Sequence, residues 1–538
     1  MIVTRCIAAV AMAALVILTA TVSYGQTPKR GGSLTLRLRE DLPQGFAIHE
    51  SPTISTMWPA MPCLSNLVLF DPLKPVHSLE TVIGELAERW SWQDDYKKLV
   101  FFLRSGVKWH DGQPFSSKDV VYTFNVVRES PGAPAKLRIS PRRGWYANVE
   151  GIDALDPLTV VFRLKRPQPS LLLLLASGFT PIYAAHLPPA TYRLGCIGTG
   201  PFKVKEWRKG EFIDYVKNPD YFVKDRPYLD GLRYQIIGER ATATAALQSG
   251  RVDASFPGDT PKGIAEQLKA VAPSLVITPV GTSVLDHLIF NTRRPPFDNL
   301  KLRQAVSRAV DRRAYASAVY QGGAVVGGPM PPKPYGVWGM LDADLVAIPG
   351  HGGDPNAERT RARAALMEVG FGPNRPLKIE MLTRGLPAFL DLGAFIVGEL
   401  KRAGIDVSLK QVESTQWFSL QARGEFDVGV DRTGLEPDDP DANFFEYYGC
   451  RSMVNYSGYC NEQIARLIEQ QSQELDPKKR LALVQEIQKK LEDTGARPAL
   501  AWRLDYFAVW PYVKNLVPHH SLYGWGRMQD VWRDRPGT

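Results

Sequence analysis

The sequence of 538 residues predicts an α/β protein, and three observations lead to that class. Patterns typical of strands and of helices alternate from Gln26 onward, as they do in α/β folds. Hydrophobic residues make up 44% and charged residues 22%, a globular composition that excludes long disorder and collagen. No repeat of about 20–50 residues is visible, which disfavours solenoids and propellers. The length predicts roughly two to four compact units.

Five segments carry strand patterns. Ser33–Arg39 alternates apolar and polar residues, which indicates a strand with one face buried. The other predicted strands are Lys98–Arg104, Leu158–Leu164, Ile379–Leu382 and Asp406–Gln411.

Helical patterns stand between and after these strands. Ser117–Arg128 begins with serine and has Asp119 in its first turn, which is typical of a capped helix. The later predicted helices are Asn299–Val319, Ala357–Val369, Leu392–Ala403, Glu462–Gln473 and Pro477–Leu491. The run Leu171–Leu175 is too short to span a membrane and predicts a buried helix or strand. Residues 322–355 are rich in glycine and proline and predict a connection that wraps a surface.

The N-terminal segment has the layout of a secretory signal peptide. A single positive charge lies in Met1–Arg5, and Ile7–Ala20 contains no charge. Small residues, Ser23 and Gly25, precede a predicted cleavage site between Gly25 and Gln26. The apolar run is shorter than the roughly 20 residues that a membrane span needs. We therefore expect residues 1–25 to be removed and the mature protein to be exported and soluble.

The net charge of +9 indicates no particular partner. The 65 basic and 56 acidic residues are interspersed along the chain, whereas nucleic-acid-binding proteins cluster their basic residues. Removal of Arg5 with the signal peptide leaves 64 basic residues against 56 acidic ones, a net charge of +8. We expect no nucleic-acid partner.

Four cysteines remain after residue 25: Cys63, Cys196, Cys450 and Cys460. In an oxidising compartment they allow three pairings, and the sequence does not choose among them. Cys450 and Cys460 could close a short loop, and Cys63 could pair with Cys196 if the fold brings them together. No cysteine or histidine spacing typical of a zinc site occurs, so we expect no metal site.

The motifs of common enzyme classes are absent from the sequence. It contains no G-x-S-x-G elbow, no H-E-x-x-H helix and no phosphate-binding G-x-x-x-x-G-K-[ST] loop. Glu436, Asp438, Asp439 and Asp441 form an acidic cluster, but the prolines between them favour an irregular loop over a ligand cage. An exported hydrolase that uses this cluster remains an alternative. The preferred interpretation is a binding protein that needs no cofactor and is not an enzyme.

Ordered segments along the mature chain resemble one family. They are residues 85–92 (ELAERWSW), 102–124 (FLRSGVKWHDGQPFSSKDVVYTF), 198–222 (GTGPFKVKEWRKGEFIDYVKNPDYF), 246–253 (ALQSGRVD), 290–322, 398–407 and 455–468. With them the sequence resembles the extracytoplasmic solute-binding proteins of family 5, which serve ABC importers of peptides and nickel. The C-terminal third is most similar to the dipeptide-binding type.

The resemblance implies a two-lobed periplasmic-binding-protein fold of type II-like topology, with an extra subdomain in lobe I and a two-strand hinge. Lobe I would hold residues 26–283 and 504–538, and lobe II residues 284–503. It also implies a periplasmic, monomeric protein that encloses a peptide-like ligand and delivers it to an ABC permease with a separate ATPase. An opine, an oligosaccharide or a nickel complex is the alternative ligand. Residues 109–112 and 198–202 would then form structural turns.

The resemblance also implies ligand-binding residues. Arg384, which follows a lobe II strand, matches the arginine that pairs with the carboxylate of a bound peptide, and such a pair suits a guanidinium. Glu436 stands four residues before Pro440, at the place of the amine-binding acid. The family's peptide binders have aspartate there, and they have a tryptophan shortly before it where this chain has Arg432.

Three further residues complete the implied site, and two cysteines form an implied disulfide. Asp438 or Asp439 could hold an amine in place of Glu436, and Trp417 could form a wall of the pocket. Cys450 and Cys460 match a disulfide pair of the dipeptide-binding type.

Overall fold

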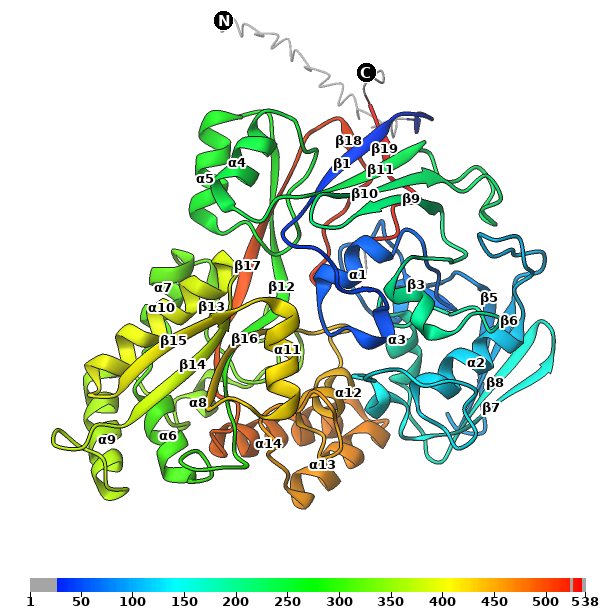
Figure 1. The fold of residues 1–538 in the computed structure, drawn as a ribbon. Coiled ribbons are helices and arrows are strands. Elements are labelled where there is room, and N and C mark those ends of the chain that lie inside the picture. Colours follow the sequence, from blue (N-terminus) through cyan, green and yellow to red (C-terminus); the bar gives the residue numbers. More distant parts are fainter. Residues whose placement is uncertain (1–26, 523–525, 535–538) are drawn as a thin grey trace, which may run out of the picture.

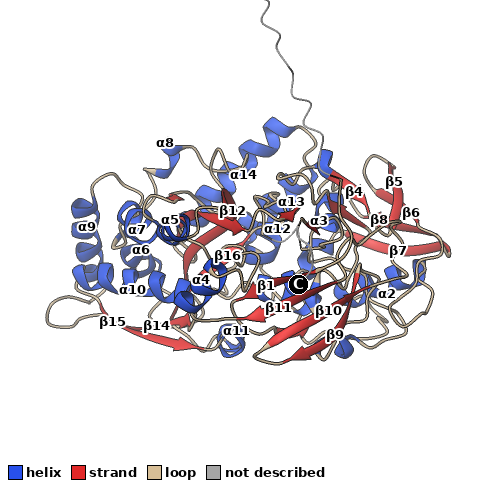
Figure 2. Ribbon diagram, turned by 90° about the horizontal axis from the view of Figure 1, so that it is seen from above, coloured by secondary structure: helices blue, strands red, loops and turns tan. Residues whose placement is uncertain are grey.

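A computed structural model describes residues 27–522 and 526–534 and confirms the predicted α/β class (Figures 1 and 2). The predicted signal peptide lies outside the described residues. Seen from above, a sheet flanked by helices occupies one side of the molecule, and most of the remaining strands occupy the other side (Figure 2).

Among the described residues, three larger sheets carry the fold. The first has the order β1 (Ser33–Leu38), β11 (Gly231–Ile236), β10 (Phe212–Lys217), β9 (Phe202–Arg208). The second has the order β13 (Ala324–Val325), β17 (Ala499–Val509), β12 (Val276–Phe290), β16 (Val428–Gly434), β14 (Lys378–Arg384), β15 (Asp406–Val412). The third is antiparallel, in the order β5 (Ala87–Gln93), β6 (Lys98–Leu103), β8 (Thr159–Leu164), β7 (Val149–Asp156). Smaller strands are β2 (Pro43–Phe46) and the pairs β3 (Val68–Phe70) with β4 (Val82–Gly84) and β18 (Val513–Lys514) with β19 (Trp532–Arg533).

Helices connect and cover these sheets (Figure 1). Those in the first half are α1 (Ile54–Ala60), α2 (Ser117–Val127), α3 (Leu171–Ala176), α4 (Arg240–Gln248) and α5 (Lys262–Val271). Those that follow are α6 (Leu300–Arg308), α7 (Arg312–Tyr320), α8 (Asp342–Leu345), α9 (Pro355–Glu368), α10 (Pro387–Arg402), α11 (Ser414–Arg423), α12 (Pro440–Asn443), α13 (Glu462–Gln473) and α14 (Pro477–Asp493). Short 3₁₀ turns occur at Ile48–Glu50, Leu79–Thr81, Arg143–Tyr146 and Pro189–Arg193, and Phe444–Tyr448 forms one π-helical turn.

The predicted helix Asn299–Val319 is wrong, because it is two helices, α6 and α7. Asp311 interrupts it: its side chain accepts hydrogen bonds from the backbone N–H groups of Arg313 and Ala314. An aspartate that bonds to the backbone in this way favours a helix start over a helix interior. The other predicted strands and helices are present with ends shifted by a few residues, and the Leu171–Leu175 run is the buried helix α3.

Strands β12 and β17 run through both halves of the molecule (Figure 1). The first part of β12 pairs with β17 from Val276↔Val509 to Gly281↔Leu504, and pairing resumes at Leu285↔Trp502. Between these stretches the register shifts, and Ser283 has a left-handed backbone with φ 48°. Beyond the shift β12 also pairs with β16. The irregularity coincides with the predicted lobe boundary at residues 283/284 and 503/504, although the lobe assignment itself stays a prediction.

Separate apolar clusters fill the two sides of this irregularity. One cluster lies against β1 and β11, with Leu34, Leu36 and Leu38 fully buried because the alternating pattern of β1 places them on one face. Another joins α6 and α10 to the six-stranded sheet through residues such as Leu302 and Ile396. Burial of these faces provides the main driving force for folding on each side.

Two disulfides are present among the described residues. Cys450 bonds to Cys460, ten residues later, and Cys63 bonds to Cys196, 133 residues later. The second pair could not be chosen from the sequence, because only the tertiary fold brings its two segments together.

The predicted turns at residues 109–112 and 198–202 pack against each other. His110 Nδ1 accepts a hydrogen bond from the Gly198 N–H at 3.3 Å, and His110 Nε2 lies 3.0 Å from the Gly200 carbonyl oxygen. Burial lowers the pKa of His110 to about 4, so the ring is neutral. Gly198 has no room for a side chain, because a Cβ atom there would overlap the Cys63 carbonyl oxygen.

This close approach predicts that Gly198→Ala destabilises the protein by about 1–3 kcal/mol, since forcing atoms into a packed site displaces the backbone. Gly195→Ala is the matched control, because a Cβ atom at Gly195 meets nothing within 4 Å. We expect it to change stability by less than about 0.5 kcal/mol. Denaturant unfolding measures both variants. Equal stability of the two would show that the Gly198 turn is not packed as described.

Candidate functional site

A cavity of about 40 Å³ lies beside the irregularity of β12 and β17. Val284 of β12 and Arg503 of β17 line it, together with residues from both predicted lobes. Ile54 and Leu522 come from one side, and Phe418 and Tyr456 are among those from the other. A space of this size holds only about three water molecules. A ligand as large as a dipeptide therefore needs the two sides to move apart.

Four arginines line this cavity: Arg39, Arg384, Arg432 and Arg503. Arg39 follows β1, Arg384 ends β14, Arg432 lies in β16 and Arg503 in β17. All four belong to segments anchored in the two sheets that meet here, so the backbone fixes their positions. Rigid placement of charged groups is what selective ligand recognition requires.

Arg384 is buried and pairs with an acid of the chain itself, Glu40. Its Nη2 lies 2.6 Å from Glu40 Oε1, and its Nε donates to Ser414 Oγ at 2.8 Å. Ser414 Oγ also donates to Glu40 Oε2. Although burial alone would raise the pKa of Glu40, the charges of Arg384 and Arg39 outweigh it and hold that pKa below its usual range. The arginine that we predicted to bind a ligand carboxylate thus forms an ion pair with a carboxylate of the chain itself.

Arg432 pairs with a buried acid on the neighbouring strand. Its Nε lies 3.0 Å from Asp286 Oδ1, and its Nη2 donates to the hydroxyl of Tyr320. Asp286 Oδ2 accepts hydrogen bonds from Tyr315, at 2.6 Å, and from Tyr320. Arg432 Nη1 is buried and has no hydrogen-bond partner among the described residues.

Arg39 and Arg503 are less well neutralised. Arg39 Nε donates to Ser55 Oγ at 3.2 Å and lies 3.7 Å from Glu40, which Arg384 holds more closely. Burial, together with the nearby charge of Arg384, lowers the pKa of Arg39 to about 10. Arg503 Nη1 donates to the Gly258 carbonyl oxygen, while its buried Nε has no hydrogen-bond partner in the described chain.

Asp431 is the one acidic residue among the described residues that line the cavity. It lies next to Arg432 on β16, and its exposed fraction is 8%. Burial raises its pKa to about 6 even though Arg384 and Arg497 lie nearby. The carboxyl therefore changes charge just below neutral pH.

Glu436 does not line the cavity. It is buried, accepts a hydrogen bond from Ser521, and lies 3.3 Å from His77 Nδ1. Burial raises the pKa of Glu436 well above its usual range and lowers that of His77 to about 3, so the His77 ring is neutral at pH 7. Ser521 precedes Leu522, which does line the cavity, so Glu436 supports the wall from behind.

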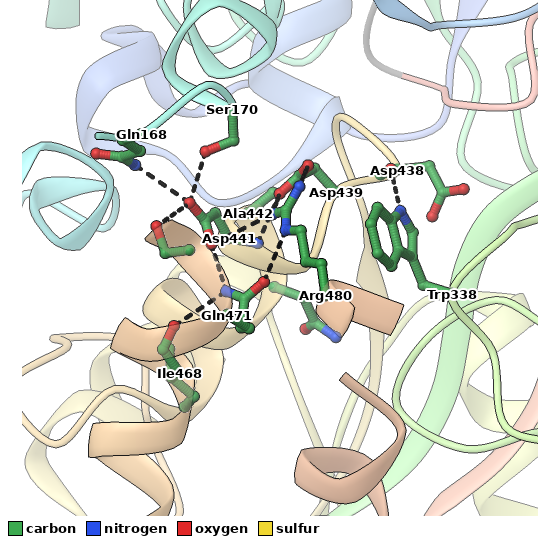
Figure 3. A network of polar contacts seen from close by, with 12 residues as sticks. Gln168, Ser170, Trp338, Asp438, Asp439, Asp441, Ala442, Ile468, Gln471 and Arg480 are labelled. Atoms are coloured by element: carbon green, nitrogen blue, oxygen red, sulfur yellow. Dashed lines mark hydrogen bonds and ion pairs between the residues drawn. The ribbon is translucent and has the colours of Figure 1, made fainter. Parts of the chain in front are cut away.

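Asp438 and Asp439 also lie away from the cavity, in a polar network around α12 (Figure 3). Asp439 forms two hydrogen bonds with Arg480, at 2.9 and 2.7 Å. The backbone carbonyl of Asp438 accepts from Trp338 Nε1 at 3.1 Å. Burial raises the pKa of the Asp438 carboxyl to about 7.

Asp441, the last acid of this cluster, connects the two sides of the molecule (Figure 3). Its Oδ2 accepts hydrogen bonds from Gln168 and Ser170, and Gln471 and Ser472 bond to the same carboxylate. Asp439 and Asp441 are buried among internal partners, so this part of the cluster is a structural network rather than a pair of carboxylates facing one cleft.

Trp417 is fully buried behind the cavity wall. Its ring meets those of Phe418 and Tyr456 edge-on, with centroids 5.1 and 5.8 Å apart, and these two residues line the cavity. Of the predicted ligand residues, only Arg384 lines the cavity itself.

Sequence reasoning missed Arg39, Asp431 and Arg503 as lining residues. Arg39 is the last residue of the alternating Ser33–Arg39 pattern. Arg432 had a signal in the sequence, because it stands where the family's peptide binders have a tryptophan. Asp431 and Arg503 carried no motif, because their role depends on which strands become neighbours.

Within residues 27–522 and 526–534, no three His, Cys, Asp or Glu side chains are grouped in a way that could hold a metal ion. No helix in this part of the chain is long and apolar enough to cross a membrane.

Most of the chain matches one known protein family. Residues 81–455 match the model described as bacterial extracellular solute-binding proteins, family 5 Middle, which is well over half of the chain. The chain belongs to family 5 of the bacterial extracellular solute-binding proteins. These proteins bind solutes for ABC importers and are not enzymes, so the hydrolase alternative is not supported.

Relatives named for short peptides cover most of this family 5 chain. The dipeptide-binding protein of Escherichia coli is 27% identical over 469 residues, which span 81% of this chain and 84% of that protein. The probable di/tripeptide-binding protein 5 of Pseudomonas aeruginosa is 26% identical over 487 residues, which span 84% of this chain and 87% of the relative.

Solved structures share the fold of this family 5 protein. The periplasmic binding protein DppA from Helicobacter pylori, in complex with the peptide STSA, has a TM-score of 0.80 at 23% identity, covering 94% of this chain and 99% of that one. The binding protein AgaA from A. tumefaciens R10, in complex with agropinic acid, has a TM-score of 0.81 at 23% identity with the same coverage. Both a peptide complex and a non-peptide complex therefore occur among the structural neighbours.

The position of Glu436 generates a prediction about stability and binding. Because its pKa is raised in the folded state, the folded protein binds a proton there more tightly than the unfolded chain, whose carboxyl has a pKa near 4.5. The contribution of Glu436 to the free energy of unfolding of the wild type should therefore fall as pH rises above about 4.5. Glu436→Gln keeps the shape without the ionisation, so its melting temperature relative to wild type should rise between pH 5 and pH 8.

The same variant should leave ligand affinity within about twofold of wild type, since Glu436 lies outside the cavity. Thermal melts across pH and calorimetric titration provide the two readouts. A tenfold loss of affinity at unchanged stability would instead assign Glu436 to the ligand.

Proposed function

We propose that the mature protein is a periplasmic carrier that encloses a small peptide-like solute between two lobes and delivers it to an ABC permease. The single observation that supports it most is the cavity itself, where buried arginines from both sides converge beside the irregularity of β12 and β17. Family membership supports the transport role, and the relatives named for di- and tripeptides support the ligand class.

Residues 26–283 with 504–538, and residues 284–503, act as the two lobes in this proposal. The hinge lies where the β12–β17 register shifts, since a strand pair without regular hydrogen bonds bends more easily there. The lobes meet across the cavity through the contact of Glu40 with Arg384 and Ser414. Ligand contacts made by both lobes stabilise the closed arrangement over the open one.

Arg384 is the proposed carboxylate-binding residue. Glu40 supplies a negative charge that balances it. A ligand carboxylate would form the same type of charge-assisted hydrogen bond, taking the place of Glu40 at the guanidinium or using the nitrogen Nη1. The ligand must therefore compete with an internal acid.

An opine-like compound is the second candidate ligand. The complex of AgaA with agropinic acid motivates it, because that protein shares the fold as closely as the peptide complexes do. Differential scanning fluorimetry with dipeptides, tripeptides and opines decides between the classes, since a ligand that binds only the folded protein raises its melting temperature. A shift with opines and none with any peptide would reject the peptide assignment.

Arg384→Gln should weaken binding of the dipeptide that gives the largest thermal shift by about 10- to 100-fold, because a hydrogen bond to a charged group contributes about 1.5–3 kcal/mol. Arg480→Gln is the matched control: it breaks a buried pair with Asp439 outside the cavity, so it should lower the melting temperature and leave the Kd unchanged. Isothermal titration measures both Kd values. Equal losses in the two variants would assign the effect to folding.

Ligand binding should also make the protein more compact. Small-angle scattering of the protein with and without that same dipeptide should give a smaller radius of gyration in its presence, because closure about the β12–β17 hinge brings the lobes together. Identical scattering curves at saturating dipeptide would contradict the hinge.

A further inference from the structure

The cavity carries more positive charge than a single carboxylate can balance. Four arginines line it, and among the described lining residues Asp431 is the one acid. The four guanidinium groups come from both lobes, so closure brings them together. Burying like charges is unfavourable unless negative groups accompany them.

The acids behind the cavity wall balance only part of this charge. Glu40 is shared by Arg384 and Arg39, and Asp286 pairs with Arg432. Within the described residues, no carboxylate lies within ion-pair distance of Arg503, while Arg39 has only the more distant contact of 3.7 Å.

The acids nearest to Arg503 are engaged elsewhere. Asp259 forms an ion pair with Arg37 at 2.7 Å. Asp505 accepts hydrogen bonds from the backbone N–H groups of Gly258 and Thr260, each at 2.8 Å. Burial raises the pKa of Asp505 to about 6, although the charge of Arg503 acts to lower it.

Two of the lining arginines also have buried nitrogen atoms without a hydrogen-bond partner in the described chain, Arg432 Nη1 and Arg503 Nε. A buried donor without a partner costs about 1–3 kcal/mol, and more when the group is charged. The exposed fraction is 5% for the side chain of Arg432 and 6% for the whole residue Arg503. Both residues line the cavity, so a ligand with acceptor oxygens there would lie beside their guanidinium groups.

We propose that the solute carries at least two anionic groups, one held by Arg384 and a second held by Arg432 and Arg503, with Arg39 between the lobes adding to the attraction. This inference rests on the proposed function, because it assigns the chemical class of the solute that the same cavity takes. The shared chemistry is that of a dicarboxylate or tricarboxylate, and an acidic dipeptide is one source of it.

Asp431 has a distinct role in this arrangement. As the acid on the cavity wall, it repels a dianion when ionised and attracts an amine. The charged or titratable groups around it are Arg384 on β14, Arg497, Asp286 on β12, and Tyr456. Asp431→Asn should therefore strengthen the binding of a ligand that is selected for its negative charge, and it should weaken the binding of a ligand that is held by its amine.

The test uses matched ligands and matched variants of the mature protein. Glu-Glu and Gln-Gln differ in charge at nearly constant shape, and succinate and tricarballylate supply two or three carboxylates without an amine. We expect Glu-Glu to bind at least tenfold more tightly than Gln-Gln in calorimetric titration. Arg432→Gln and Arg503→Gln should each reduce this preference at least tenfold while changing the Gln-Gln affinity less than threefold, and Arg480→Gln should leave it unchanged.

Asp431→Asn covers the case in which the arginine variants fail to fold, since it removes no cation from the site. It should strengthen Glu-Glu binding about three- to tenfold at pH 7.5. Protonation of Asp431 should produce the same gain in wild type as pH falls from 7.5 to 5.5, and the variant should lose this dependence. Asp505→Asn controls for the acid nearest in sequence to Arg503, whose pKa is also about 6.

The outcomes separate the two proposals. Equal or tighter binding of Gln-Gln, or weaker Glu-Glu binding in Asp431→Asn, overturns the dianion inference and leaves the peptide carrier standing. Binding of succinate or tricarballylate that depends on Arg432, with no peptide bound, supports the dianion inference and rejects the peptide ligand. If no acidic probe binds, the inference is overturned.

Discussion

The pairing of β12 with β17 is the constraint on which the rest of this structure depends. The two strands are the shared part of both halves, and each half builds its own apolar cluster on its own stretch of the pair. Where their register shifts, the backbone leaves regular pairing, and the cavity lies at that point, with Val284 and Arg503 in its wall. A site placed there receives residues from both halves, which is what a closing clamp needs.

Burying several arginines at such a point is costly, and the chain offsets the cost only in part. Glu40 pairs with Arg384, and Asp286, supported by two tyrosine hydroxyls, balances Arg432. These pairs restrain the arginine side chains that they contact. Preorganised groups lose less entropy when they bind a ligand, which favours affinity.

The acidic cluster between residues 436 and 441 shows how the same residue type serves a different purpose a short distance away. Asp439 is matched by Arg480, and Asp441 is surrounded by hydroxyl and amide donors from both sides of the molecule. Fully partnered carboxylates of this kind hold loops in register and have no capacity left for a ligand or for acid–base chemistry. Their position in sequence, close to Asp431 and Arg432, gives no hint of this difference.

The sequence by itself determined the α/β class, most strands and helices, and the family, because apolar periodicity, caps and ordered motifs are local properties. Through the family resemblance it also pointed to Arg384, which lines the cavity. It could not determine where one helical pattern would divide at Asp311, that Cys63 would meet Cys196, or that Glu436 would lie behind the cavity wall while Asp431 lies on it. Only the tertiary structure decided these points, because charge and burial at a site depend on which distant segments come together there. Arg39, Arg432 and Arg503 are scattered over more than 460 residues, and they form one cationic surface only because β1, β16 and β17 converge beside the bend of the shared strands.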